Sequence, residues 1–195
     1  MRRYFKTAAA IALAMSCLSA PTLAETLEIS SQTQTVLEHD WDTHPFLLKY
    51  SDGRTLSSEE LRGKMVFVMA WASWCGPCKP SLPKYAPLYE GNIGNPYVKV
   101  LSAHLSSRYG RFNSPAEVLA SKGLYYPIIE DPDGQFVNTL GKTSASFGVP
   151  HYVLIDGSGK IIRRYGEIND MVIMDVENEF YRHTKAERAK AFQNP

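Results

Sequence analysis

The sequence predicts an α/β fold in which helices pack on both faces of a central sheet. Residues 65–71 are continuously apolar, and a run without alternation is typical of a strand buried on both faces. Helix-like and strand-like segments then alternate along the chain, which favours a sheet layered between helices. The chain has 195 residues and 44% of them are hydrophobic, which is enough for one domain with a substantial core.

Residues 1–24 have the three parts of a secretory signal peptide. A basic start at 1–6 is followed by an apolar stretch at 7–18 and by small residues up to Ala24. The apolar stretch is shorter than the about 20 residues that cross a bilayer. We expect cleavage after Ala24 and export to the periplasm, and an uncleaved membrane anchor is the alternative.

Loss of this leader changes both the charge and the cysteine count. The mature chain keeps 18 basic and 20 acidic residues, a balance that favours neither nucleic acid nor an anionic membrane surface as a partner. Cys17 lies in the leader, so only Cys75 and Cys78 remain. A structural disulfide framework would use more cysteines at wider spacing, and a zinc site would need two further ligands. The pair therefore indicates a redox catalyst that uses neither a metal nor another cofactor.

A polar extension at residues 25–45 precedes a predicted β-hairpin. Residues 46–50 and 54–56 have strand character, and the Ser-Asp-Gly sequence between them is typical of a tight turn. Residues 57–61 predict a short helix, because serines that can cap it are followed by acidic residues in the first turn. The buried strand at 65–71 comes next.

After the buried strand, helices and strands alternate. The segment that follows Ser114 predicts a helix capped by that serine, with Pro115 in the first turn. An Asp-Gly-Ser-Gly sequence near the end predicts a closing hairpin. In chain order, the predicted elements are a helix from near Cys75 to about Tyr89, a strand at 97–101, a helix at 114–122, an extended segment at 126–129, a helix at 136–147, strands at 151–155 and 160–165, and a last helix within 168–192.

The chemistry of the chain is predicted to reside in the sequence Trp74-Cys75-Gly76-Pro77-Cys78-Lys79. A helix that begins near Cys75 would offer unpaired N–H groups and a positive dipole end, and both favour the reactive thiolate. Gly76 and Pro77 keep the two sulfur atoms on one turn. Cys75, at the exposed entrance, is the predicted nucleophile, and Cys78 resolves the mixed disulfide. Trp74 is predicted to form an apolar shoulder, while Lys79 either favours the thiolate or is simply solvated.

Trp-Cys-Gly-Pro-Cys after an apolar strand resembles the thioredoxin superfamily. Residues 46–78 and 147–157 resemble its exported TlpA/ResA-like branch, which includes the thioredoxin-like proteins of cytochrome c maturation. The resemblance implies a thioredoxin-like domain over residues 46–185, with a central mixed sheet, flanking helices and an N-terminal hairpin extension, and residues 186–195 as a polar tail. It also implies a protein disulfide as substrate, a transmembrane thiol electron donor, a position near the membrane and a monomer.

The resemblance assigns further site residues around Pro150. In the family a cis proline faces the cysteines, and the backbone of the preceding residue, here Val149, lies beside the attacking sulfur and pairs with the substrate. His151 follows directly. Two interpretations of this histidine stay open: an imidazolium near Cys75 that lowers the pKa of the thiol, or a strand histidine that points elsewhere.

Two positions depart from the family pattern. Thioredoxins carry a buried acid where this chain has Met69, and the exported branch often carries a glutamate where this chain has Ser81. A buried carboxylate there would exchange a proton with the resolving thiol. Proton transfer at Cys78 must therefore use water or another residue.

The leading functional prediction is an exported disulfide reductase. The Gly-Pro dipeptide resembles thioredoxin, whose reduction potential is roughly −270 mV, against roughly −120 mV for a strong oxidant of the same fold. A disulfide oxidant or isomerase stays open, since the surroundings of the cysteines also set the potential. The alternative from another class is a copper-binding or copper-delivery protein, in which His104 or His151 would join the two cysteines as a ligand.

Overall fold

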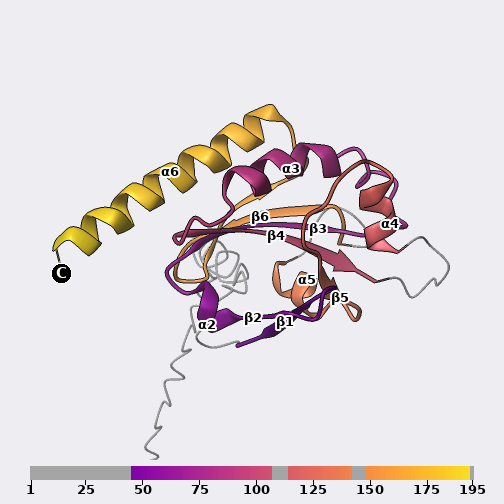
Figure 1. Cartoon of the computed structure of the whole chain (residues 1–195), viewed down its shortest axis with the longest axis horizontal. Coiled ribbons are helices and arrows are strands. Elements are labelled where there is room, and N and C mark those ends of the chain that lie inside the picture. Colours follow the sequence, from indigo (N-terminus) through magenta and orange to yellow (C-terminus); the bar gives the residue numbers. More distant parts are fainter. Residues whose placement is uncertain (1–44, 107–113, 142–147, 194–195) are drawn as a thin grey trace, which may run out of the picture. The chain divides into compact units, whose positions relative to one another are not determined.

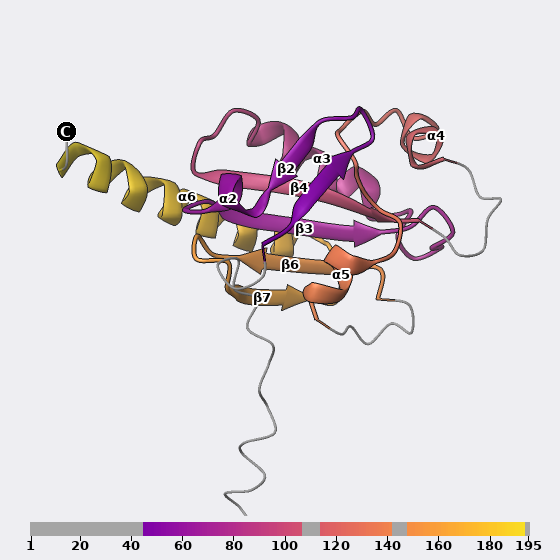
Figure 2. The same cartoon turned by 90° about the horizontal axis from the view of Figure 1, so that it is seen from below.

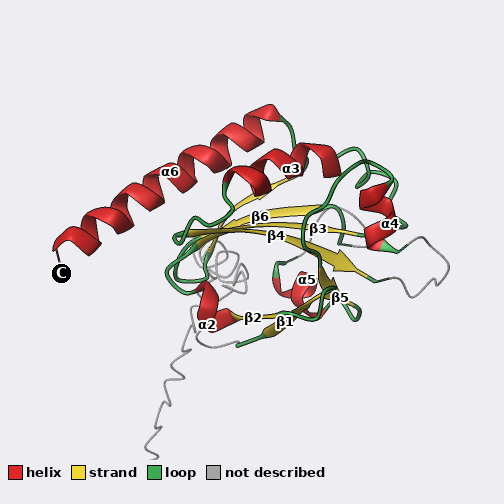
Figure 3. Cartoon of the chain, in the orientation of Figure 1, coloured by secondary structure: helices red, strands yellow, loops and turns green. Residues whose placement is uncertain are grey.

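The computed structural model describes residues 45–106, 114–141 and 148–193. The predicted leader and nearly all of the predicted extension lie outside these residues. Within them, strands and helices alternate, and the strands gather into one sheet with helices beside it (Figure 3). No helix in these three segments is long and apolar enough to cross a membrane.

The sheet has seven strands in the order β2-β1-β5-β4-β3-β6-β7. Figure 2 shows β4, β3, β6 and β7 side by side. The central strands β3, β4 and β5 run parallel, whereas β1, β2, β6 and β7 pair antiparallel with their neighbours, so the sheet is mixed. The strands are β1 Leu47–Tyr50, β2 Thr55–Ser57, β3 Met65–Trp71, β4 Val98–Leu105, β5 Ile129–Asp131, β6 His151–Ile155 and β7 Ile161–Tyr165.

Helices cover both faces of this sheet. Helices α3 and α6 lie together on one face, and α5 lies on the other (Figures 1 and 2). The helices are α2 Ser58–Leu61, α3 Leu82–Gly91, α4 Pro115–Ala120, α5 Gln135–Thr139 and α6 Asp170–Gln193. The predicted α/β class, the mixed sheet and the N-terminal hairpin are confirmed.

Strand β3 lies at the centre of the core. All of its residues are buried, because β4 and β6 flank it within the sheet and helix α6 contacts it from one face. Its largest side chains, Phe67, Met69 and Trp71, are fully buried. The continuous apolar run in the sequence therefore corresponds to a strand without a solvent-facing side, as predicted, and this strand leads directly into the cysteine motif.

Two of the short helices begin at a capping box. At α4, the Ser114 hydroxyl accepts a hydrogen bond from the Glu117 backbone N–H at 3.2 Å, and the Glu117 carboxylate accepts one from the Ser114 N–H at 2.9 Å. Ser57 and Glu60 repeat this exchange at α2. Each pair satisfies two backbone donors that the first turn of a helix leaves unpaired. The predicted cap at Ser114 is confirmed.

Helix α5 is shorter than predicted, whereas α6 lies where the last helix was predicted but crosses the boundary drawn for the domain. The sequence predicted a helix at 136–147, but α5 ends at Thr139 and Gly141 follows with a left-handed φ of 89°. A glycine in this conformation terminates a helix, and residues 142–147 lie outside the described residues. Helix α6 instead crosses the predicted domain boundary at residue 185 and continues to Gln193, because its last turns consist of good helix formers.

Candidate active site

The cysteine motif lies where β3 ends. Residues 72–81 form a series of turns between β3 and α3, and Cys75 and Cys78 are joined by a disulfide within them. The Cys75 N–H donates to the Ala72 carbonyl at 3.0 Å, and the Cys78 N–H donates to Cys75 Sγ at 3.2 Å. A backbone N–H directed at this sulfur stabilises a thiolate there, since a hydrogen bond to the charged form favours that form.

The helix after the motif begins later than the sequence predicted. We expected it near Cys75, but α3 starts at Leu82, and the preceding turns are closed by bonds of the i to i+3 type such as Ser81 N–H to the Cys78 carbonyl at 3.0 Å. Pro80 and Pro83 explain the delay, because neither has an N–H to donate and each disfavours the helical conformation of the residue before it. The Cys75 sulfur therefore lies on a turn that precedes the N-terminus of α3, and the stabilisation expected from that terminus is replaced by the Cys78 N–H.

The outer surface of the motif is formed by its non-cysteine residues. Gly76, Pro77 and Lys79 are exposed, and Trp74 is half-buried and packs against the core. Cys75 is only 4% exposed and Cys78 1% exposed. The sequence predicted an exposed Cys75, but Cys75 is buried almost as deeply as Cys78.

The Val149–Pro150 peptide bond is cis, as predicted. Strand β6 begins at the next residue and pairs antiparallel with β3, with His151 opposite Ala70. This register brings the Val149–Pro150 segment beside the end of β3, where the cysteine turns begin.

His151 does not provide a cation for the thiol. Its ring nitrogen Nε2 lies 3.1 Å from the Leu140 carbonyl, and the residue is 3% exposed. Burial lowers the pKa of His151, and the nearby Arg164 lowers it further, against the opposing effect of the bond to Leu140. An imidazole with a lowered pKa is uncharged at neutral pH, so the structure favours the second of the two interpretations, a strand histidine bonded elsewhere.

Two pairs of buried polar side chains flank the motif in roles that the sequence did not reveal, since His104 was considered only as a copper ligand and Ser81 only as the position without a glutamate. Before the cysteines, Ser73 pairs with His104 of β4, with its Oγ 2.9 Å from the ring nitrogen Nε2. After them, the Tyr152 hydroxyl of β6 donates to Ser81 Oγ at 2.7 Å. The sequence signal was weak, because both serines lie on turns and β4 contains Lys99 and Ser102 besides His104. The structure thus ties Ser81 to a neutral tyrosine.

The part of the chain that the structure describes contains no set of side chains placed to bind a metal ion. No group of three or more His, Cys, Asp or Glu side chains there is arranged to hold a metal ion. The two histidines considered as copper ligands are engaged elsewhere, His104 with Ser73 and His151 with the Leu140 carbonyl.

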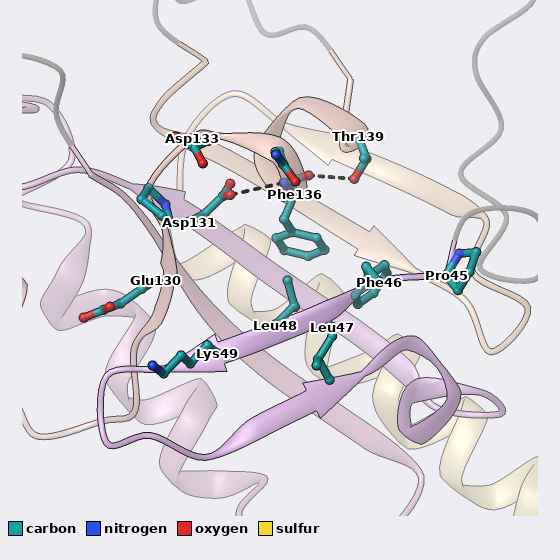
Figure 4. Close-up of a pocket in the computed structure, with 12 residues that line it drawn as sticks. Pro45, Phe46, Leu47, Leu48, Lys49, Glu130, Asp131, Asp133, Phe136 and Thr139 are labelled. Carbon is teal, nitrogen blue, oxygen red and sulfur yellow. Dashed lines mark hydrogen bonds between the residues drawn. The ribbon is translucent and has the colours of Figure 1, made fainter.

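A cavity of about 510 Å³ opens between β1, β5 and α5, and no cysteine lines it (Figure 4). Phe46 and Phe136 pack at its apolar side with their ring centroids 5.3 Å apart. Asp131 at its edge is buried and accepts hydrogen bonds from the backbone N–H groups of Phe136 and Val137, which fixes the start of α5. The polar edge of this cavity thus serves helix α5, and we do not assign the cavity to the redox chemistry.

The Tyr152–Ser81 hydrogen bond predicts a characteristic pattern of stability changes. Burial raises the pKa of Tyr152, so its hydroxyl stays protonated and donates. Tyr152→Phe and Ser81→Ala are each expected to lower the free energy of unfolding by about 1 kcal/mol, because each leaves a buried partner unpaired. The double variant is expected to lose less than the sum of both, as measured by urea unfolding of the oxidised proteins. Additive losses would show that the two hydroxyls do not interact.

The chain matches known proteins over most of its length. A family model described as Redoxin matches residues 27–178. The thiol-disulfide oxidoreductase ResA of Bacillus subtilis (strain 168) is 26% identical over 139 residues, which cover 70% of this chain and 73% of that protein. ResA of Geobacillus thermodenitrificans (strain NG80-2) is 32% identical over 117 residues, covering 60% and 62% of the two chains.

Solved structures show the same fold. StoA from Bacillus subtilis superposes with a TM-score of 0.55 at 22% identity, covering 68% of this chain and 96% of that chain. The exposed lipoprotein thioredoxin Etrx1 of Streptococcus pneumoniae strain TIGR4 superposes with a TM-score of 0.54 at 29% identity, covering 69% and 98%. The thioredoxin-like fold inferred from the cysteine motif is therefore confirmed.

Proposed function

The chain belongs to the Redoxin family, within the ResA-like branch of the thioredoxin superfamily, and from this premise we propose that it is an exported protein-disulfide reductase. Its relatives place it among the thiol–disulfide oxidoreductases. The observation that carries the proposal is the Cys75–Cys78 disulfide at the end of β3, with the Cys78 N–H directed at Cys75 Sγ. Two cysteines that can close a disulfide within one turn can, in the reduced state, exchange with the disulfide of a substrate.

The proposed reaction has two exchange steps. The Cys75 thiolate attacks one sulfur of a substrate protein's disulfide, a mixed disulfide forms, and the second substrate sulfur leaves as a thiolate. Cys78 loses its proton to water and attacks Cys75 Sγ, so that the Cys75–Cys78 bond forms while the bond between Cys75 and the substrate breaks. The substrate sulfur that was bonded to Cys75 leaves as a thiolate, and protons from water convert both substrate thiolates to the dithiol. The cysteine pair gives up two electrons, and a membrane-bound dithiol protein, which is oxidised in turn, returns them to the pair.

Two features support the assignment of Cys75 as the attacking residue. Its sulfur is the one that accepts the Cys78 N–H, so its thiolate is the better stabilised of the two. Cys75 is also the slightly more exposed cysteine. In the proposed complex, the Val149 backbone beside the cis Pro150 pairs with an extended segment of the substrate, and the exposed Gly76, Pro77 and Lys79 contact it.

The reductase direction rests on the Gly-Pro dipeptide between the cysteines, and the export rests on the leader at residues 1–24. We propose that the mature protein begins after Ala24 and acts in the periplasm close to the membrane. The N-terminal residue of the protein recovered from the periplasmic fraction checks this point. An N-terminal Glu25 would agree with cleavage after Ala24, whereas an N-terminal Met1 would contradict it.

The reduction potential of the mature protein tests the direction of electron flow. We expect a value near or below roughly −250 mV when the pair is equilibrated with dithiothreitol or glutathione. A value above roughly −150 mV would make the protein an oxidant or isomerase instead. The double variant Cys75→Ser, Cys78→Ser is the control, since it should show no redox transition in the same titration.

A further inference from the structure

His104 is a buried histidine beside the cysteine turns. It is the next-to-last residue of β4, opposite Trp71 of β3 in the parallel register, and it is 4% exposed. Its ring meets the Trp71 indole edge to face, with the centroids 4.8 Å apart. Glu130, its register partner on β5, is exposed to solvent.

The hydrogen bonds of His104 define which of its nitrogens carries the proton. The Ser73 backbone N–H donates to Nε2 at 3.1 Å. A backbone N–H can only donate, so Nε2 must present its lone pair and the proton of the neutral ring must reside on Nδ1. Nδ1 is buried and has no hydrogen-bond partner among the residues that the structure describes. Burial lowers the pKa of His104 to about 4, which agrees with a neutral ring.

One peptide group links His104 to the backbone of Cys75. The peptide group that joins Ala72 to Ser73 donates through its N–H to His104 and accepts through its carbonyl from the Cys75 N–H at 3.0 Å. Both polar groups of this peptide unit are therefore hydrogen-bonded, and its carbonyl holds the backbone of Cys75 in place. Cys75 Sγ in turn accepts from the Cys78 N–H at 3.2 Å. The two hydrogen bonds of the Ala72–Ser73 peptide group polarise each other, because one peptide unit donates in the first and accepts in the second.

We propose that His104 is a positioning residue for the attacking thiol, which it holds through the Ala72–Ser73 peptide group. The motif requires such support because its cysteines lie on turns that precede α3 and lack the i to i+4 bonds of a helix. The proposal rests on the proposed function only in taking Cys75 as the attacking residue.

Nitrogen NMR of the oxidised wild-type protein tests the geometry directly. We expect the imidazole ¹⁵N shifts of His104 to show a protonated Nδ1 and an unprotonated Nε2 at neutral pH, and the Ser73 amide to be protected from hydrogen exchange. A protonated Nε2 would overturn the proposal, because that nitrogen could not accept the Ser73 N–H.

Two matched variants test the consequence for the thiol. His104→Phe keeps an aromatic ring against Trp71 but removes the acceptor, whereas His104→Gln can place its side-chain oxygen near the position of Nε2. In the reduced proteins, we expect His104→Phe to slow alkylation of Cys75 at pH 7 by about fivefold or more through a raised thiol pKa, and His104→Gln to stay within about twofold of the wild type.

The readouts separate this proposal from the function and from simple loss of stability. An alkylation rate and a Cys75 pKa in His104→Phe equal to those of the wild type would overturn it, and so would equal losses in both variants. If His104→Phe does not fold, the comparison of His104→Gln with the wild type and the NMR measurement decide. A reduction potential typical of an oxidant would contradict the reductase assignment. The effect of the His104 variants on the pKa of Cys75 would still test the positioning role.

Discussion

A Cys78→Ala variant is expected to lose multiple-turnover disulfide reduction by about a thousandfold or more while it accumulates a mixed disulfide through Cys75. The reason is the order of the two exchange steps. Cys75 can still attack the substrate, but no second sulfur lies within the turn to resolve the product, since Cys78 is its partner in the disulfide. Non-reducing electrophoresis with a disulfide-bonded protein such as insulin, followed by peptide mapping, would detect the trapped species.

Cys75→Ala is the matched control for this experiment. It removes the same number of sulfur atoms from the same turn but should form no mixed disulfide, because Cys78 is only 1% exposed and the backbone N–H that stabilises a thiolate in this turn is directed at Cys75 Sγ. Trapping through Cys78 in the Cys75→Ala protein, with none in the Cys78→Ala protein, would reverse the assigned roles of the two cysteines.

Trp71→Ala is expected to give the largest loss of stability among single substitutions near the site. Trp71 is fully buried, and its indole N–H donates to Ser102 Oγ at 2.8 Å. Removal of a buried tryptophan typically costs about 3–5 kcal/mol, because the cavity closes only in part. The Ser102 hydroxyl would also lose its partner. We expect the midpoint of thermal unfolding of the oxidised protein to fall by about 10 °C.

Trp71→Phe is the control, because it retains a ring in the cavity and loses only the indole N–H and part of the volume. Its loss of stability should be clearly smaller than that of Trp71→Ala. A loss below about 1 kcal/mol for Trp71→Ala would show that the surrounding side chains collapse into the space, contrary to the close packing of β3 against β4.

Two parts of the fold that the sequence predicted have a local cause. The buried strand at 65–71 and the cap at Ser114 each follow from residues that lie next to one another in the chain, whereas the cis bond at Pro150 was implied by the family resemblance. The late start of α3 also had a local signal, because Pro80 and Pro83 are visible in the sequence. Their combined effect on the first turn was the part that the sequence analysis underestimated.

The roles of His104 and His151 could not be predicted in the same way. The bond between His104 and Ser73 depends on the register of β4 against β3, which no local pattern specifies. Strand β6 is buried at every position, so alternation could not reveal which face of the sheet His151 occupies or that it meets the Leu140 carbonyl. Both assignments required the three-dimensional arrangement of the strands.

His104 and His151, both of them buried, also couple the folding of this protein to proton uptake. In the unfolded chain each would titrate near the ordinary histidine pKa of 6.5, whereas burial lowers the pKa of His104 to about 4 and lowers that of His151 as well. The unfolded state therefore binds more protons than the native state in mildly acidic solution. For His104 this difference applies between about pH 6.5 and 4. As the pH is lowered through this range, the free energy of unfolding decreases by at most about 1.4 kcal/mol per pH unit for each buried histidine. These two buried imidazoles thus set an acid limit on the conditions in which the fold persists.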